Sequence, residues 1–101
     1  MDILCNENGQ DLTVKLKGEL DHHFATEFRG KIDERLNSGQ VKNLTFDMEK
    51  LDFIDSSAIG FIIGRYKIVK KNDGKLEIIN ASHKIRRILD MSGVGKIINI
   101  K

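Results

Sequence analysis

Hydrophobic and polar residues alternate with the period of a β-strand near the start of the chain. Leu12, Val14 and Leu16 are separated by single polar residues, which predicts a half-buried strand. Residues 3–5 predict a shorter strand before it. The Asn-Gly pair at positions 8–9 favours a tight turn between the two, because both residue types tolerate a positive φ. The first two strands are therefore expected to form an antiparallel hairpin.

The apolar pattern then changes to a helical period. A helix is predicted from Asp21, as its N-cap, to about Ser38, and Gly39 is expected to end it. Its apolar residues recur at every fourth position and form one stripe, made of Phe24, Phe28, Ile32 and Leu36.

The remaining elements continue in strand–helix alternation. Strands are expected around residues 44–48 and 76–79, with a turn at 73–74 between the second helix and the later strand. The second helix is expected from Ser56 to about Lys71. A third helix is expected between a Ser82 cap and Gly93, followed by an edge strand at 97–100. Such alternation predicts one α/β domain over residues 1–101, with a small mixed sheet, the hairpin followed by parallel strands, and helices mainly on one face.

The second predicted helix carries apolar residues on two faces. The face assigned to the core holds Ile59, Ile62, Ile63, Tyr66 and Val69. Phe61, Gly64 and Ile68 lie on the opposite side. A helix that is apolar on two sides is either buried twice or binds something, so these three residues are either a partner surface or covered by a neighbouring helix. Gly60 and Gly64 also predict a close contact with this helix.

Composition and charge narrow the classes of function. The 101 residues carry 17 basic and 15 acidic side chains, a net charge of +2, without the basic stripe typical of nucleic-acid binders. Cys5 is the only cysteine, which excludes an intramolecular disulfide and fits a reducing compartment. The start of the chain lacks signal-peptide features, and no apolar run approaches the ~20 residues of a membrane helix. A cytoplasmic protein that binds neither nucleic acid nor membranes is expected.

Three consecutive cap-type residues, Asp55, Ser56 and Ser57, stand where the second helix begins. One side-chain cap is enough for a helix start, so at least one hydroxyl is free for other chemistry. Ser56 has three interpretations: a plain N-cap, a catalytic nucleophile, or a phosphorylation site.

A nucleophilic serine needs a nearby base and an oxyanion site. The candidate bases are His22, His23 and His83, and the first two are expected at the same sheet end as Ser56. However, the glycine-flanked nucleophile elbow of many serine hydrolases is missing. The side chains of the adjacent histidines point in different directions, which argues against a metal site. The sequence contains no glycine-rich phosphate loop, the motif that would indicate a nucleotide cofactor. No cofactor is expected.

Phosphorylation suits the start of a helix. A phosphoserine there meets free N–H groups and the positive end of the helix dipole, so the domain is expected to tolerate it. The added charge of about −1.5 to −2, beside Asp55, would oppose docking onto a partner surface that lacks compensating charge. Phosphorylation of Ser56 is therefore expected to release a partner.

The segment from Asp55 to Gly60, followed by residues 64–67, resembles the signature of bacterial anti-sigma-factor antagonists of the STAS domain class. Residues 18–23 and 90–93 resemble further segments of the sporulation sigma-F antagonist branch. The similarity covers essentially the whole chain. The family usually has glycine where this chain has Ala58. Alanine is the better helix former, so a firmer helix start is expected, and its methyl group adds bulk beside Ser56.

The resemblance implies a regulatory binding module rather than an enzyme. The unmodified protein would bind an anti-sigma factor that is also a serine kinase, with its nucleotide, and free the sigma factor. The kinase would phosphorylate Ser56, and a metal-dependent serine phosphatase would reverse this. A STAS module of a stress-response cascade is the main alternative, and a small serine hydrolase is another. The expected partner contacts are Asp21, Asp55, Ser57, Phe61, Gly64 and Ile68.

Overall fold

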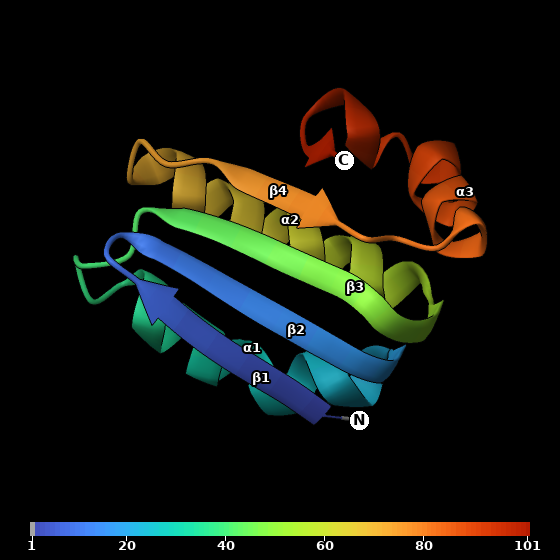
Figure 1. The fold of residues 1–101 in the computed structure, drawn as a ribbon, viewed down its shortest axis with the longest axis horizontal. Helices are drawn as coiled ribbons and strands as arrows, with labels where there is room; N and C mark the ends of the chain where they lie inside the picture. The colour runs from blue at the N-terminus through green and yellow to red at the C-terminus, as the bar shows by residue number, and fades with distance from the viewer. Residues whose placement is uncertain (1) are drawn as a thin grey trace.

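A five-stranded mixed sheet forms the body of the computed structural model, which describes residues 2–101 (Figure 1). The strands are β1 (Asp2–Asn8), β2 (Asp11–Leu20), β3 (Asn43–Ile54), β4 (Leu76–Ile79) and β5 (Asn99–Ile100), and they lie side by side in chain order. β1 and β2 are antiparallel, and every later pair is parallel. The predicted hairpin and mixed α/β sheet are confirmed.

Two long helices, α1 (His22–Leu36) and α2 (Ser56–Lys71), pack on the same face of the sheet (Figure 1). The third, α3 (His83–Ser92), follows β4 and lies beyond the end of that short strand, and a 3-10 turn at Val94–Lys96 leads into β5. The opposite face of β1, β2 and β3, called the open face below, is left without a helix. Helices mainly on one face are therefore also confirmed.

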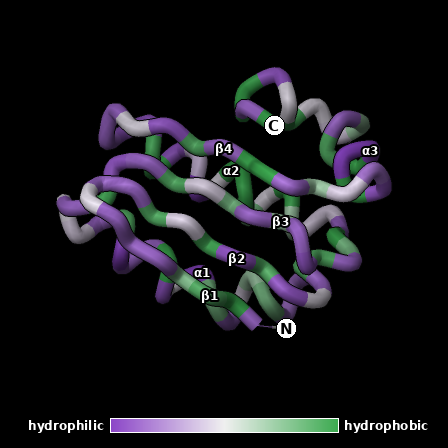
Figure 2. Tube along the Cα trace, in the orientation of Figure 1, coloured by the Kyte–Doolittle hydropathy of each residue, from purple (hydrophilic) through white to green (hydrophobic). Residues whose placement is uncertain are grey.

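The core lies between the sheet and α1 and α2. Leu12, Val14 and Leu16 of β2 are buried, as predicted from their alternation, and Leu20 at the end of the strand is buried as well. Figure 2 shows the corresponding mixture of apolar and polar segments along the strands. Within residues 2–101, no helix is long and apolar enough to cross a bilayer.

Helix and turn boundaries follow local chemistry with small departures from prediction. Ser82 Oγ accepts the Ile85 N–H at 3.2 Å, and Gly93 ends α3 in the left-handed conformation, as expected. α1 ends earlier than predicted, with Asn37 and not Gly39 as its C-cap. The hairpin turn holds residues 9–10 rather than 8–9, because Asn8 pairs with Asp11. Gly9 alone in that turn has a positive φ.

β3 is longer and less regular than its sequence pattern indicates. Register shifts against β2 occur after Asp47 and again between Leu51 and Phe53. Each shift adds a residue to β3, which is a β-bulge that reverses the side-chain alternation. The first bulge places the Leu51 side chain in the core. After the second bulge, the Ile54 side chain lies in the core and the Phe53 side chain on the open face.

Candidate functional site

The carboxyl ends of β2 and β3 bring two helix starts together. Leu20 and Ile54, the last residues of these strands, are paired in register. Asp21 and Asp55 follow them directly, and the Asp55 N–H donates to the Leu20 carbonyl at 3.3 Å. The expectation that the Asp21 and Ser56 segments share one sheet end is confirmed. We call this region, formed by Asp21, Asp55, Ser56 and Ser57, the Ser56 edge.

Both aspartates at this edge are N-caps. Asp21 Oδ1 accepts the Phe24 N–H at 3.1 Å, and Asp55 Oδ1 accepts the Ala58 N–H at 3.0 Å. Each carboxylate therefore satisfies an N–H group that helix geometry leaves without a partner. Because Asp55 caps α2, the interpretation of Ser56 as the cap is wrong.

The two serines occupy the first turn of α2. Ser56 is exposed and Ser57 is half-buried. Within residues 2–101, neither hydroxyl makes a hydrogen bond to the protein. The N-cap hydrogen bond to the Ala58 N–H is made by Asp55. The Ser56 hydroxyl is thus free and accessible at the positive end of a helix dipole.

Four acidic side chains lie at or just after the carboxyl ends of β2 and β3. Glu19 and Asp52 are exposed at the ends of β2 and β3, and Asp21 and Asp55 are half-buried beside them. Lys50 is the nearby basic side chain on β3, paired in register with Lys17. A phosphate on Ser56 would increase the negative charge that this edge already carries.

Phe61 does not belong to an open surface. It is 4% exposed, and its ring centroid lies 5.9 Å from those of Phe24 on α1 and Phe46 on β3. The neighbouring helix of the same chain covers it, so its assignment as a partner contact is wrong. The cause is geometric: α2 must pack against both the sheet and α1, and two apolar faces serve that purpose.

Arg65 completes the contact between α1 and α2. Its side chain is buried, its Nε lies 2.8 Å from Asp33 Oδ1, and its guanidinium carbon lies 4.9 Å from the Phe61 ring centroid. Burial lowers the pKa of Arg65, the Asp33 charge opposes this, and Arg29 adds to the lowering. The guanidinium nevertheless stays charged at neutral pH. We call the contact formed by Phe24, Asp33, Phe61 and Arg65 the helix seam.

The other predicted features of α2 are only partly as expected. Nothing lies within 4 Å of a Cβ built at Gly60 or Gly64, so no close contact within the described residues explains these glycines, and a contact with a partner stays a prediction. Gly64 and Ile68 are half-buried, and their partner role stays a prediction. Ala58 is fully buried, so its methyl group points into the core and does not stand in the way of a protein approaching Ser56.

The histidines offer little catalytic chemistry. His22 and His23 are exposed at the start of α1, with ring centroids 6.3 Å apart. Across residues 2–101, no hydrogen bond links an imidazole to Ser56, and no group of three or more His, Cys, Asp or Glu side chains is placed to hold a metal ion. His83 begins α3 and is also exposed.

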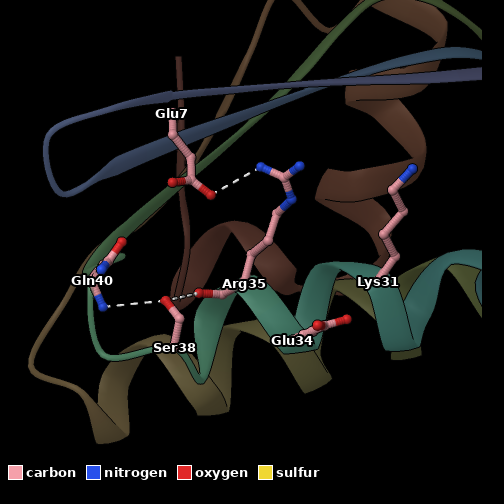
Figure 3. Close-up of a pocket in the computed structure, with 6 residues that line it drawn as sticks. All are labelled: Glu7, Lys31, Glu34, Arg35, Ser38 and Gln40. Atoms are coloured by element: carbon pink, nitrogen blue, oxygen red, sulfur yellow. Dashed lines mark hydrogen bonds and ion pairs between the residues drawn. The ribbon is translucent and has the colours of Figure 1, made fainter.

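A surface hollow of about 460 Å³ lies at the far end of α1 from the Ser56 edge (Figure 3). Arg35 Nη1 donates to Glu7 Oε1 at 2.9 Å, and the Ser38 hydroxyl donates to the Arg35 carbonyl at 2.8 Å. Arg35 and Ser38 thus already have partners, whereas the charged side chains of Lys31 and Glu34, which also line the hollow, are exposed. The charged side chains of the hollow are therefore open to solvent and not buried around a binding site.

Phe53 is an exposed aromatic residue close to Ser56 in sequence that the sequence analysis did not single out. This aromatic side chain is 40% exposed, three residues before Ser56. Its exposure follows from the second bulge of β3, which breaks the period of two. A large apolar residue next to the cap-type run was the available signal, and only the structure shows which way its side chain points.

Comparison with known proteins gives a consistent family. The model of the STAS domain matches residues 2–101. The chain is 38% identical to the anti-sigma F factor antagonist of Paenibacillus polymyxa over 89 residues, covering 88% of this chain and 76% of the relative. It is 32% identical to the anti-sigma-B factor antagonist of Bacillus subtilis over 100 residues, covering 99% and 88%.

Solved structures agree with this similarity. The unphosphorylated form of the anti-sigma factor antagonist SpoIIAA superposes with a TM-score of 0.82 at 25% identity, covering 99% of this chain and 87% of that one. The phosphorylated form of the Bacillus cell fate determinant SpoIIAA gives a TM-score of 0.80 at 28% identity, covering 99% and 91%.

Proposed function

The chain belongs to the STAS-domain family of anti-sigma-factor antagonists, and from this membership we propose that it binds an anti-sigma factor through the Ser56 edge. Binding by the unmodified protein frees a sigma factor from its inhibitor. The anti-sigma factor is itself a nucleotide-bound serine kinase, and phosphorylation of Ser56 ends the interaction. A metal-dependent serine phosphatase restores the binding form. Both forms act in the cytoplasm.

One observation carries this proposal: Asp55 caps α2, so the Ser56 hydroxyl is left exposed and without a partner within the described residues 2–101. A kinase needs an accessible hydroxyl, and the domain needs that hydroxyl to be dispensable for folding. The solved phosphorylated form of SpoIIAA supports the view that this fold accepts a phosphate.

The chemical step is a phosphoryl transfer. The Ser56 Oγ attacks the γ-phosphorus of ATP, ADP leaves, and the hydroxyl proton passes to a base of the kinase. The phosphatase hydrolyses the phosphoserine: water attacks the phosphorus, the bond to Ser56 Oγ breaks, the serine oxygen takes up a proton, and inorganic phosphate is released. This chain supplies only the nucleophile and its position.

The free-energy balance gives the switch its direction. A phosphate at the α2 start gains about 0.3–1 kcal/mol from the helix dipole, so the folded domain is not weakened. Against a partner surface, the dianion is added beside Asp21 and Asp55, and uncompensated burial costs several kcal/mol. Because ~1.4 kcal/mol is tenfold in affinity, phosphorylation is expected to weaken binding by more than a hundredfold.

The test mixes the full chain with anti-sigma factors from the same genome and ATP, and maps the phosphate by mass spectrometry. One phosphate on Ser56 is expected. Ser57→Ala is the control for the position of the phosphate: it should still be phosphorylated on Ser56, at a rate that reports any contribution of Ser57 to docking. Ser56→Ala should stay bound and unmodified. Phosphate on Ser57, or Ser56→Asp binding as tightly as the parent, would contradict the proposal.

A second candidate is a stress-response role. It is favoured by the 32% identity to the anti-sigma-B factor antagonist of Bacillus subtilis, which spans 99% of this chain. The same binding experiment separates the two roles, because the anti-sigma factors of the two cascades are different proteins and only the cognate one should bind tightly.

A further inference from the structure

Phe53 is a large apolar side chain that the fold leaves at the surface. It is 40% exposed, whereas Leu51 and Ile54 on the same strand end are 4% and 2% exposed. The second bulge of β3 accounts for the difference, because it turns Phe53 to the open face and Ile54 to the core. β-Bulges re-aim side chains and are common next to functional sites.

Phe53 lies beside the Ser56 edge. It pairs in register with Glu19, two residues before Asp21, and Ile54 pairs with Leu20. Three residues of chain span at most about 11 Å, which limits the separation of the Phe53 and Ser56 Cα atoms. Both residues therefore belong to one corner of the molecule.

Any protein that docks on Ser56 must reach this corner. A stable interface covers about 800 Å² of each partner, which corresponds to a disc with a radius of about 16 Å. A disc centred on Ser56 thus includes the Phe53 backbone. Aromatic residues, Phe among them, are enriched in interfaces, and a few well-packed anchors near the centre carry most of the binding energy.

We propose that Phe53 is the apolar anchor of the Ser56 edge and inserts into an apolar pocket on the anti-sigma factor. This inference rests on the proposed function and adds the residue that supplies affinity. Ser56 and its neighbours are polar and control whether docking is allowed. Phe53 buries apolar surface in the docked state and has no role in the phosphoryl transfer.

The direct test is Phe53→Ala in the full, unphosphorylated chain, with affinity for the nucleotide-bound anti-sigma factor measured by calorimetry. A loss of at least tenfold is expected. Ile97→Ala is the matched control, because Ile97 is also a large apolar side chain and is 48% exposed. It lies near Lys70 and Lys75, where α2 ends and β4 begins, away from the Ser56 edge. This control should change affinity by less than twofold.

Phosphorylation kinetics give a second readout. Phe53→Ala should raise KM for phosphorylation of Ser56 by about the same factor and leave kcat within twofold, because docking and not chemistry is altered. Phe53→Leu keeps an apolar side chain and serves as a second variant if Phe53→Ala folds poorly. It should lose less affinity than Phe53→Ser. Thermal unfolding of each variant separates folding from docking.

The outcomes are distinguishable. If the parent binds, Ser56→Asp does not, and Phe53→Ala binds like the parent, the anchor is refuted while the proposed function stands. Equal affinities of Phe53→Leu and Phe53→Ser would refute it as well. If the parent itself binds no anti-sigma factor, the proposed function and the anchor fail together.

Discussion

The helix seam and the Ser56 edge are both built from α1 and α2, yet they differ in almost every physical respect. The seam buries an aromatic cluster and the Arg65–Asp33 ion pair. The edge keeps two carboxylates and two hydroxyls at or near the surface. The seam packs the two helices against each other, whereas the pairing of Leu20 with Ile54 brings the Asp21 and Ser56 segments to the same sheet end. The residues that pack the two helices together are therefore different from the residues proposed for partner binding.

Phe61→Ala should have the largest effect on stability and tests whether the helix seam and the Ser56 edge are independent. Removing a buried aromatic side chain costs about 3–5 kcal/mol, measured as the free energy of unfolding in urea. Ser56 should still be phosphorylated by the kinase at a temperature where the variant is folded. A loss below about 1 kcal/mol would show that the seam is less tightly packed than the structure indicates.

Asp33→Ala should come next in size. It leaves the Arg65 guanidinium buried without its anion, which costs 3–5 kcal/mol in fully buried pairs. The Asp33 side chain is 25% exposed, so water moderates the penalty and about 2 kcal/mol is expected from urea unfolding. The control is the double variant Asp33→Leu with Arg65→Met, which should recover most of the loss; no recovery would mean that packing of Asp33 itself matters.

At the Ser56 edge, Asp55→Ala and Ser56→Ala should differ clearly. Loss of the α2 N-cap costs about 1 kcal/mol, whereas Ser56 makes no cap bond and its replacement should change stability by less than about 0.5 kcal/mol. Thermal unfolding of the two variants measures the contrast. Asp21→Ala provides a parallel case at α1. Equal losses for Asp55→Ala and Ser56→Ala would contradict the assignment of the cap.

The smallest predicted effect is a gain. Gly60 is exposed within α2, and a Cβ there meets nothing within 4 Å, so Gly60→Ala should stabilise the domain by about 0.5–1 kcal/mol. Gly74→Ala is the opposite control, because a Cβ at Gly74 collides with the Lys42 carbonyl. Calorimetric melting of both variants checks the pair; a destabilising Gly60→Ala would imply an unseen contact at that position.

Much of the fold follows from local patterns, and the failures have physical causes. Strand alternation in β2 and the caps at Asp21 and Ser82 are set by neighbouring residues, so short windows of sequence contain them. The packing partner of Phe61 is not local, because it depends on how α1 docks against α2. A helix apolar on two sides looks the same in sequence whether its second neighbour is internal or external.

The candidate site divides in the same way. The run Asp55-Ser56-Ser57 predicts a spare hydroxyl, and the structure shows that Asp55 is the cap. The orientation of Phe53 depends on two bulges in β3, and these bulges depend on how β3 pairs with β2. They interrupt the two-residue period from which strand faces are predicted. Phe61, expected at a partner surface, is buried, and Phe53, for which no prediction was made from the sequence, is exposed.

The pairing of Leu20 with Ile54 has a consequence for how the molecule is recognised. A short peptide cut around Ser56 keeps the hydroxyl but loses Asp21, which comes from a distant part of the chain and arrives only when the sheet has formed. A protein that contacts both strand ends therefore distinguishes a native molecule from a denatured or truncated one. If the proposed partner contacts both segments, it binds the folded molecule and not an unfolded copy, in which Asp21 and Ser56 are far apart.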